Sequence, residues 1–373
     1  MGIRGSSTGT LILENARVPR ENLLGEIGKG HKIAFNILNF GRFKLGASVV
    51  EAIRWAENEA IGYAKRRVQF GKPIIEFGAI QHKLAEMAVR VYSAESMVYR
   101  TAGMIDGAMR CLDQASLSAP ADTLKMMEEY AVECSVIKVA STEILDFVVD
   151  ESVQVFGGYG YSRDYPIERA YRDARINRIF EGTNEMNRLL ITGQLLKRAM
   201  RGELGLLKAA QKLIDEVLSP PLVDDSGDGP LILESRMVSN AKKMFLLAVG
   251  VAAQRYRDKI SGQQEILCLL SDLVIEIYAM ESVLLRVLKG TGQDGILKWD
   301  LPIKSAKVYI HGKFPFLENN VKQILVAVSD GDDLRIQLAA LRRFAKGMPI
   351  DLIALRREIA KALNEAGKYC LSN

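Results

Sequence analysis

HKIAFNILNFGRFKLGASVVEAIRWAENEA, residues 31–60, is the stretch that decides the fold class. Its apolar residues recur mostly at steps of three and four, namely Ile33, Ile37, Phe40, Leu45, Val49, Ile53, Ala56 and Ala60. Such steps place side chains on one face of an α-helix, so the stretch predicts a long helix that packs on a core. The break Gly71-Lys72-Pro73 ends it.

The same period predicts helices along the rest of the chain. Before a Pro- and Asp-rich linker they cover 80–109, 122–156, 167–176 and 184–200, with a loop at Ser118-Ala119-Pro120. After the linker they cover 266–287, 301–328, 333–346 and 351–366. Long helices with short connections predict an antiparallel bundle, so the fold class is mainly α.

Four segments follow from these breaks. Residues 1–28 contain a strand-like run, Thr10–Val18, and read as a short β remnant. The remaining segments are a four-helix bundle over 29–200, a linker with a possible amphipathic helix over 201–230, and a second helical domain over 231–373.

Composition excludes several classes of protein. The 373 residues are 48% hydrophobic and 25% charged with a net charge of +5 and no basic tract, which argues against disorder and against nucleic acid as a partner. The four cysteines, Cys111, Cys134, Cys268 and Cys370, have no C-x-x-C spacing, so neither a disulfide framework nor a Cys/His metal site is expected.

Glu181 is the residue that stands out chemically. It lies between Phe180 and Gly182, just before a helix that Thr183 or Asn184 could cap. A carboxylate beside an aromatic ring in a dry cleft suits a general base. The simpler interpretation is an ordinary acidic residue at a helix start, which the helix dipole favours.

Several ordered motifs resemble one family. They are Gln154-Val-Phe-Gly-Gly-Tyr-Gly160, Arg178-Ile-Phe-Glu-Gly-Thr-Asn184, Tyr63-Ala-Lys-Arg-Arg-Val-Gln-Phe-Gly-Lys-Pro-Ile74 and the opening Met1-Gly-Ile-Arg-Gly-Ser6. Together they resemble the acyl-CoA dehydrogenases. The extra helical domain at 231–373 is most similar to that of the very-long-chain branch.

The resemblance implies FAD-dependent α,β-dehydrogenation of long-chain fatty acyl-CoA thioesters. It implies that Glu181 removes the α-proton while a hydride leaves the β-carbon for the flavin. In a few relatives the base comes instead from a position that matches Gly41. Glycine cannot act as a base, which favours Glu181.

The resemblance also assigns roles to other residues. Those that match FAD contacts are Arg67, Gln69, Phe70, Gln154, Gly157, Gly158, Thr183, Asn184 and Glu185. Those that match substrate contacts are Asn39, Arg42, Phe180 and Gly182. Without the family, Arg67 would be a solvated charge at a helix end, Gln154 a satisfied core amide, and Gly157-Gly158 a helix C-cap.

The implied partners are a second copy of the chain in a homodimer, with Arg67 and Gln154 in the neighbour's flavin site, and an electron-transfer flavoprotein as acceptor. At most weak peripheral membrane attachment is expected, because residues 204–218 read as an ordinary packed helix. A chain without a secretion signal would work in the bacterial cytoplasm, or in the mitochondrial matrix or at its inner membrane in a eukaryote.

Two alternatives stay open at this point. One is a non-catalytic helical assembly or scaffold protein on the same fold, and the other is an unrelated bundle. The resemblance also implies that the family's N-terminal domain and most of its β-domain are absent here, so the chain reads as a fragment, and whether it is active alone stays open.

Overall fold

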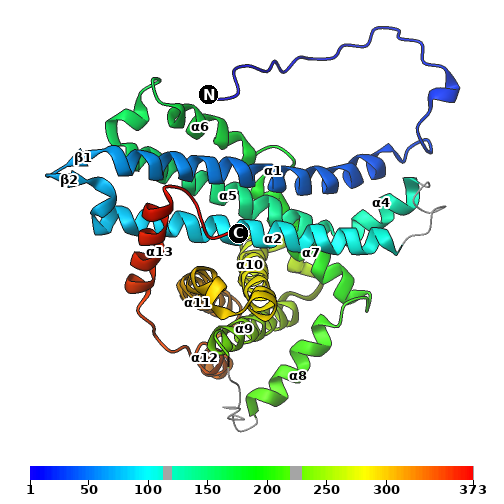
Figure 1. Ribbon diagram of the computed structural model, residues 1–373. Coiled ribbons are helices and arrows are strands. Elements are labelled where there is room, and N and C mark those ends of the chain that lie inside the picture. Colours follow the sequence, from blue (N-terminus) through cyan, green and yellow to red (C-terminus); the bar gives the residue numbers. More distant parts are fainter. Residues whose placement is uncertain (112–119, 219–228, 373) are drawn as a thin grey trace.

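The computed structural model describes residues 1–111, 120–218 and 229–372, and 80% of it is helical (Figure 1). The mainly α class is therefore confirmed. The predicted loop at 118–120 and the linker at 219–230 lie largely outside the described residues. In the described part of the chain, no helix is long and apolar enough to cross a membrane.

Four long helices form the bundle: α1 (Gly30–Arg66), α2 (Gly78–Arg110), α5 (Ala131–Phe156) and α7 (Asn184–Met200). α1 and α5 run in the same direction, because Gly46 packs on Ile137 and the hydroxyl of Ser152 donates to the carbonyl of Ala56 at 3.2 Å. α2 and α7 run the opposite way. The buried stripe of α1 includes Val49, Ile53, Ala56 and Ala60, as predicted.

The first turns of α1 depart from the prediction. Ile37 and Phe40 were expected in the core, but they expose 57% and 55% of their surface. In the described structure no other element covers this side of the helix, so periodicity alone marked a face that the core does not use.

The predicted helix over 122–156 is two helices, α4 (Pro120–Glu129) and α5. Tyr130 leaves the helical conformation between them, with φ −96° and ψ 14°, and its hydroxyl donates to the carbonyl of Met104 at 3.1 Å. This contact with α2 depends on packing and has no signal in the local pattern.

The prediction of a strand at Thr10–Val18 is wrong. The run is exposed along its whole length and forms no strand in the described structure. A strand needs a neighbouring backbone to pair its N–H and C=O groups, and no described segment runs beside this one. Figure 1 shows residues 1–29 as a thread that leaves the bundle, with only its beginning near α6 (Pro166–Ala174), where the N–H of Ile3 donates to Asp173.

The C-terminal helices pack directly on the bundle. They are α8 (Leu206–Leu218), α9 (Ile232–Tyr256), α10 (Gln264–Asp294), α11 (Asp300–Val328), α12 (Gly331–Phe344) and α13 (Leu352–Ala366). One apolar cluster runs from Ile53 of α1 through Met87 of α2 to Leu270 of α10 and Leu363 of α13, so both helical parts share a core. α8 packs on α9, with the buried Leu213 facing inward.

Candidate active site

Glu181 and Gly182 form a tight turn before α7. Both residues have left-handed backbone conformations, with φ of 58° and 81°. For a non-glycine residue this conformation costs about 1–3 kcal/mol, so it persists only where surrounding contacts hold it. Thr183 caps α7, since its hydroxyl accepts the N–H of Met186 at 3.3 Å.

The carboxylate of Glu181 lies against α1 at Gly41. A Cβ at position 41 would stand 2.6 Å from Oε2 of Glu181 and 2.9 Å from its Cδ, so a side chain there would displace the carboxylate from this position. Oε2 is buried and has no hydrogen-bond partner among the described residues. The lone pairs of Oε2 are therefore not used by any described donor.

Three side chains hold the turn by its carbonyl groups. The amide of Asn187 donates to the carbonyls of Gly182 at 2.8 Å and Thr183 at 3.0 Å, and weakly to that of Glu181 at 3.4 Å. The guanidinium of Arg42 donates to the carbonyl of Glu181 at 3.3 Å, and Lys138 Nζ donates to that of Gly182 at 2.8 Å. These contacts stabilise a conformation that the backbone alone disfavours.

Lys138 has no exposed surface and projects from the middle of α5. Besides Gly182, its ammonium binds Oδ1 of Asn184 at 2.6 Å. Burial lowers its pKa to about 8, against the opposing charges of Glu143 and Glu185. A buried ammonium is costly unless it is paired, so Lys138 is present for the contacts it makes.

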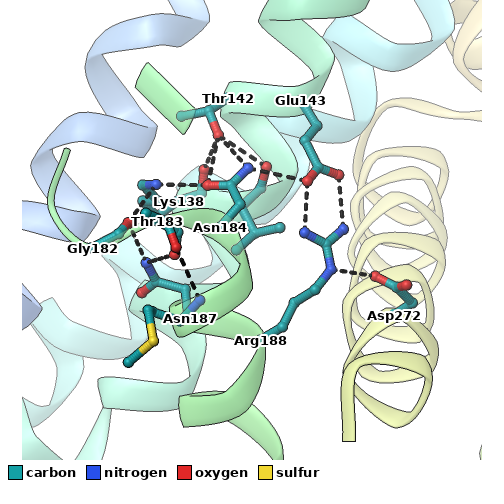
Figure 2. A network of polar contacts seen from close by, with 11 residues as sticks. Lys138, Thr142, Glu143, Gly182, Thr183, Asn184, Asn187, Arg188 and Asp272 are labelled. Carbon is teal, nitrogen blue, oxygen red and sulfur yellow. Dashed lines mark hydrogen bonds and ion pairs between the residues drawn. The ribbon is translucent and has the colours of Figure 1, made fainter. Parts of the chain in front are cut away.

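The contacts continue from Asn184 to the C-terminal domain (Figure 2). The Asn184 amide donates to Thr142 Oγ1 at 3.2 Å and to Glu143 Oε1 at 3.1 Å. Glu143 receives two hydrogen bonds from Arg188, at 2.7 and 3.0 Å, and Nε of Arg188 donates to Asp272 of α10 at 2.7 Å.

The predicted substrate and cofactor residues near Glu181 differ in how far they are exposed. Phe180 is 40% exposed beside the turn, and Glu185 is exposed in the first turn of α7. Asn39 and Arg42 are buried, and Arg42 Nη1 donates to Asn39 Oδ1 at 2.8 Å, so they form the wall behind Glu181.

Asn184 was also expected to contact the cofactor, and that stays a prediction. It is only 2% exposed, and both ends of its amide are bonded to Lys138, Thr142 and Glu143. Within the described structure the side-chain amide is thus engaged in contacts that hold the start of α7.

The other predicted FAD residues gather at the far end of α1. Arg67 ends this helix and leads into a hairpin of β1 (Val68–Gln69) and β2 (Lys72–Pro73), paired antiparallel with Gln69 opposite Lys72. Gln69 and Phe70 are exposed, Phe70 by 92%. A guanidinium and an aromatic ring at the surface suit a phosphate-containing or stacking partner.

The end of α5 lies beside this hairpin. The guanidinium of Arg67 stands 5.3 Å from the ring centre of Tyr159, in the 3-10 helix Gly157–Tyr161. Gln154 and Gly158 are exposed there, so Gln154 is not a core amide. Gly157, at φ 61°, is also the C-cap of α5.

The two clusters are far apart in one chain. Arg42 and Arg67 are 25 positions apart along α1, which corresponds to roughly 37 Å at 1.5 Å per residue. Residues near Glu181 and residues near Arg67 therefore cannot surround the same small molecule within one chain.

Comparison with known proteins agrees with this architecture. The sequence model described as "Acyl-CoA dehydrogenase, C-terminal domain" matches residues 28–196, and a second model with the same description matches residues 240–343. The chain belongs to the acyl-CoA dehydrogenase family. The interpretation as an unrelated bundle is excluded.

Members of the acyl-CoA dehydrogenase family resemble the chain over most of its length. A probable acyl-CoA dehydrogenase of Bacillus subtilis is 45% identical over 99% of this chain and 62% of its own length. A very long-chain specific mitochondrial enzyme of Macaca fascicularis is 33% identical over 79% of this chain and 45% of its own. A crystal structure of an acyl-CoA dehydrogenase complexed with FAD from Bacillus anthracis has a TM-score of 0.93 and 46% identity, over 96% of this chain and 61% of that one.

The chain thus spans about half to three fifths of the length of these acyl-CoA dehydrogenases. Its two matched regions correspond to the bundle and to the C-terminal helices. Glu181 and its supporting turn belong to the first of them.

Sequence reasoning missed Lys138, Asn187 and the Arg188–Asp272 pair. Lys138 had a usable signal, since it is the single charge in the run Cys134-Ser-Val-Ile-Lys-Val-Ala140. A charge within such an apolar run is usually paired inside the protein. Arg188 and Asp272 had none, because their pairing depends on how α7 meets α10.

Proposed function

We propose that this chain carries the proton-abstracting half of an acyl-CoA dehydrogenase that acts on long-chain acyl-CoA thioesters with FAD. The observation that carries the proposal is the buried, unpartnered Oε2 of Glu181 over Gly41. A scaffold protein has no need of a strained turn that presents an unpaired carboxylate, so this feature favours the enzyme.

In the proposed reaction Glu181 accepts the α-proton of the thioester at its carboxylate. The electron pair left on the α-carbon forms the double bond as a hydride departs from the β-carbon. The chemistry that FAD supplies when bound is acceptance of this hydride. Negative charge develops on the thioester oxygen, and no described acceptor uses the N–H of Glu181, so this N–H is available to bind that oxygen.

The surface residues around Arg67 fit a dinucleotide. A partly exposed guanidinium can bind a pyrophosphate with two charge-assisted hydrogen bonds, and Gln69, Phe70 and Gln154 are exposed next to it. Because this cluster lies roughly 37 Å from the Glu181 turn along α1, it would serve the flavin of a second copy. The distance supports a homodimer in which each FAD touches both chains.

Long-chain substrates are supported by the likeness to the mitochondrial very long-chain enzyme. That likeness covers 79% of the chain, more than the bundle over 29–200 can account for. We extend the proposal to an electron-transfer flavoprotein as acceptor and to at most weak peripheral membrane attachment. The packing of α8 on α9 is consistent with the latter.

The test uses a chimaera that joins this chain to the part of the Bacillus subtilis relative that it does not span. We expect a yellow protein whose visible flavin spectrum bleaches when palmitoyl-CoA is added without oxygen. Glu181→Gln should keep the flavin but lose at least ~10²–10⁴-fold in turnover, the usual cost of a missing general base.

Glu365→Gln is the matched control, because Glu365 is an exposed carboxylate on α13 away from the turn. It should leave turnover unchanged. Near-normal turnover of Glu181→Gln would refute the assignment, and a colourless protein that never takes up FAD would support the scaffold alternative instead.

A further inference from the structure

A continuous chain of polar contacts joins the C-terminal domain to the turn that carries Glu181. We name it the polar chain; its members, in order, are Asp272, Arg188, Glu143, Asn184, Lys138 and the carbonyl of Gly182. Each contact is between 2.6 and 3.1 Å, and every one has a charged group on at least one side. Figure 2 shows that α5, α7 and α10 each contribute to it.

Arg188 is the member of the polar chain that connects the bundle to α10. Its side chain is 16% exposed and lies between two carboxylates, with Glu143 on the bundle and Asp272 on α10. Although burial opposes it, the hydrogen bonds that Arg188 donates to Glu143 and the charge of Asp272 raise the pKa of the guanidinium. Arg188 is therefore charged at every working pH, and its position depends on the contacts with both Glu143 and Asp272.

Neutral contacts fix the same connection. The hydroxyl of Ser271 donates to the carbonyl of Arg188, and that of Thr192 donates to the carbonyl of Leu267 at 2.9 Å. Both Ser271 and Thr192 are buried. α7 is thus held on α10 at Arg188 and Thr192, which follow the helix start at Asn184, and a shift of α10 would move the polar chain.

We propose that Asp272 is a positioning residue for the turn that carries Glu181, so that the C-terminal domain is part of the catalytic device. Asp272 fixes Arg188, which orients Glu143 and the Asn184 amide. Asn184 in turn fixes Lys138 on the carbonyl of Gly182. The catalytic part of the inference rests on the proposed function, whereas the effect on the turn does not.

A second contact between the two parts supplies a matched control. Glu281 of α10 accepts from Arg100 of the bundle at 2.9 Å, and its side chain is 22% exposed against 25% for Asp272. Glu281 also contacts Lys242 of α9, but none of its contacts leads to the turn. Glu281→Gln removes the ion pairs of a carboxylate of similar burial, with Arg100 and Lys242, without touching the polar chain.

The first measurement is amide hydrogen exchange of the chain itself, read in the peptide that covers residues 180–187. Asp272→Asn replaces the carboxylate that accepts from Arg188 by a neutral amide and removes the ion pair, so exchange in this peptide should rise about five- to tenfold. Glu281→Gln should leave it unchanged. Equal exchange in wild type and Asp272→Asn, or equal acceleration by both variants, would overturn the proposal.

A double-variant cycle separates coupling from general loosening. Lys138→Met removes the last side chain of the polar chain, which contacts the carbonyl of Gly182, and should accelerate exchange in the same peptide at least as much. If Asp272 acts through Lys138, the double variant exchanges no faster than Lys138→Met alone. If the two substitutions instead multiply each other's effect on the exchange rate, Asp272 acts on the turn independently of Lys138, and the inference is wrong.

The second measurement is turnover of the flavin-containing chimaera. Asp272→Asn should lower kcat about tenfold with little change in KM, because a misplaced base affects the chemical step and not the binding of the thioester. Unchanged kcat with a loosened turn would refute the catalytic role. If wild type itself shows no turnover, the proposed function fails, and the exchange results alone decide whether Asp272 positions the turn.

Discussion

Glu57 offers a direct test of how this chain's stability depends on pH. It projects from α1 into the contact between the bundle and the C-terminal tail, has no exposed surface, and neither carboxylate oxygen has a hydrogen-bond partner among the described residues. Burial, reinforced by the charge of Glu95 and opposed by that of Arg54, raises its pKa well above the ordinary value of 4.5.

The sign follows from proton counts. Above pH 4.5 the unfolded chain has released the Glu57 proton while the folded chain still holds it, so the folded state binds more protons. The contribution of Glu57 to the free energy of unfolding therefore falls as pH rises, by about 1.4 kcal/mol per pH unit, until the folded-state pKa is reached. The contribution of Glu57 to stability is greatest below pH 4.5, where the group is protonated in both states.

Glu57→Gln has almost the same shape as the protonated acid and does not titrate. Near pH 4.5 the variant and the wild type should unfold at nearly the same urea concentration. At higher pH the variant should be the more stable, and its advantage should widen by about 1.4 kcal/mol for each pH unit. Urea unfolding of both proteins from pH 5 upward, in steps of about half a unit, measures this difference.

Glu51→Gln is the matched control, because Glu51 is on the same helix, also contacts Arg54, and is 78% exposed. Its stability should run parallel to that of the wild type at every pH. Parallel curves for Glu57→Gln as well would mean that Glu57 is ionised in the folded protein, and the argument from burial would be refuted.

Two further predictions concern the flavin-containing chimaera. Gly41→Ala adds a Cβ 2.6 Å from Oε2 of Glu181 and should displace the base. A shift of about 1 Å costs on the order of 10²-fold in kcat. The control is Gly103→Ala, which has open space around it and should retain the wild-type rate. Equal rates for the two glycine variants would show that the carboxylate does not work from this position. Arg67→Ala should weaken FAD binding by ~1.5–3 kcal/mol in a titration followed by flavin fluorescence, with little change in the melting temperature. Arg66→Ala removes the same charge one residue away, so an identical loss of affinity in both would speak against a specific pyrophosphate contact.

The sequence by itself determined the helical class and marked Glu181 as a candidate base. Spacing of apolar residues depends only on the period of the helix, so it is legible in Val49, Ile53 and Ala56 without any knowledge of their partners. Glu181 was visible through its neighbours Phe180 and Gly182, because a tight turn before a helix has local requirements. Local interactions of this kind depend on residues that are close together in the sequence.

Tertiary structure alone decided which distant groups meet. Gly41 and Glu181 are 140 positions apart, and only the packing of α1 against the start of α7 brings the carboxylate over the glycine. Packing also brings Arg188 to Asp272. It likewise places Tyr130, where the helix breaks, beside Met104. The exposure of Ile37 and Phe40 makes the same point from the other side, since a helix period says which residues share a face but not what covers it. Charge pairing and burial are properties of surfaces that exist only after the helices have packed, so no local pattern encodes them.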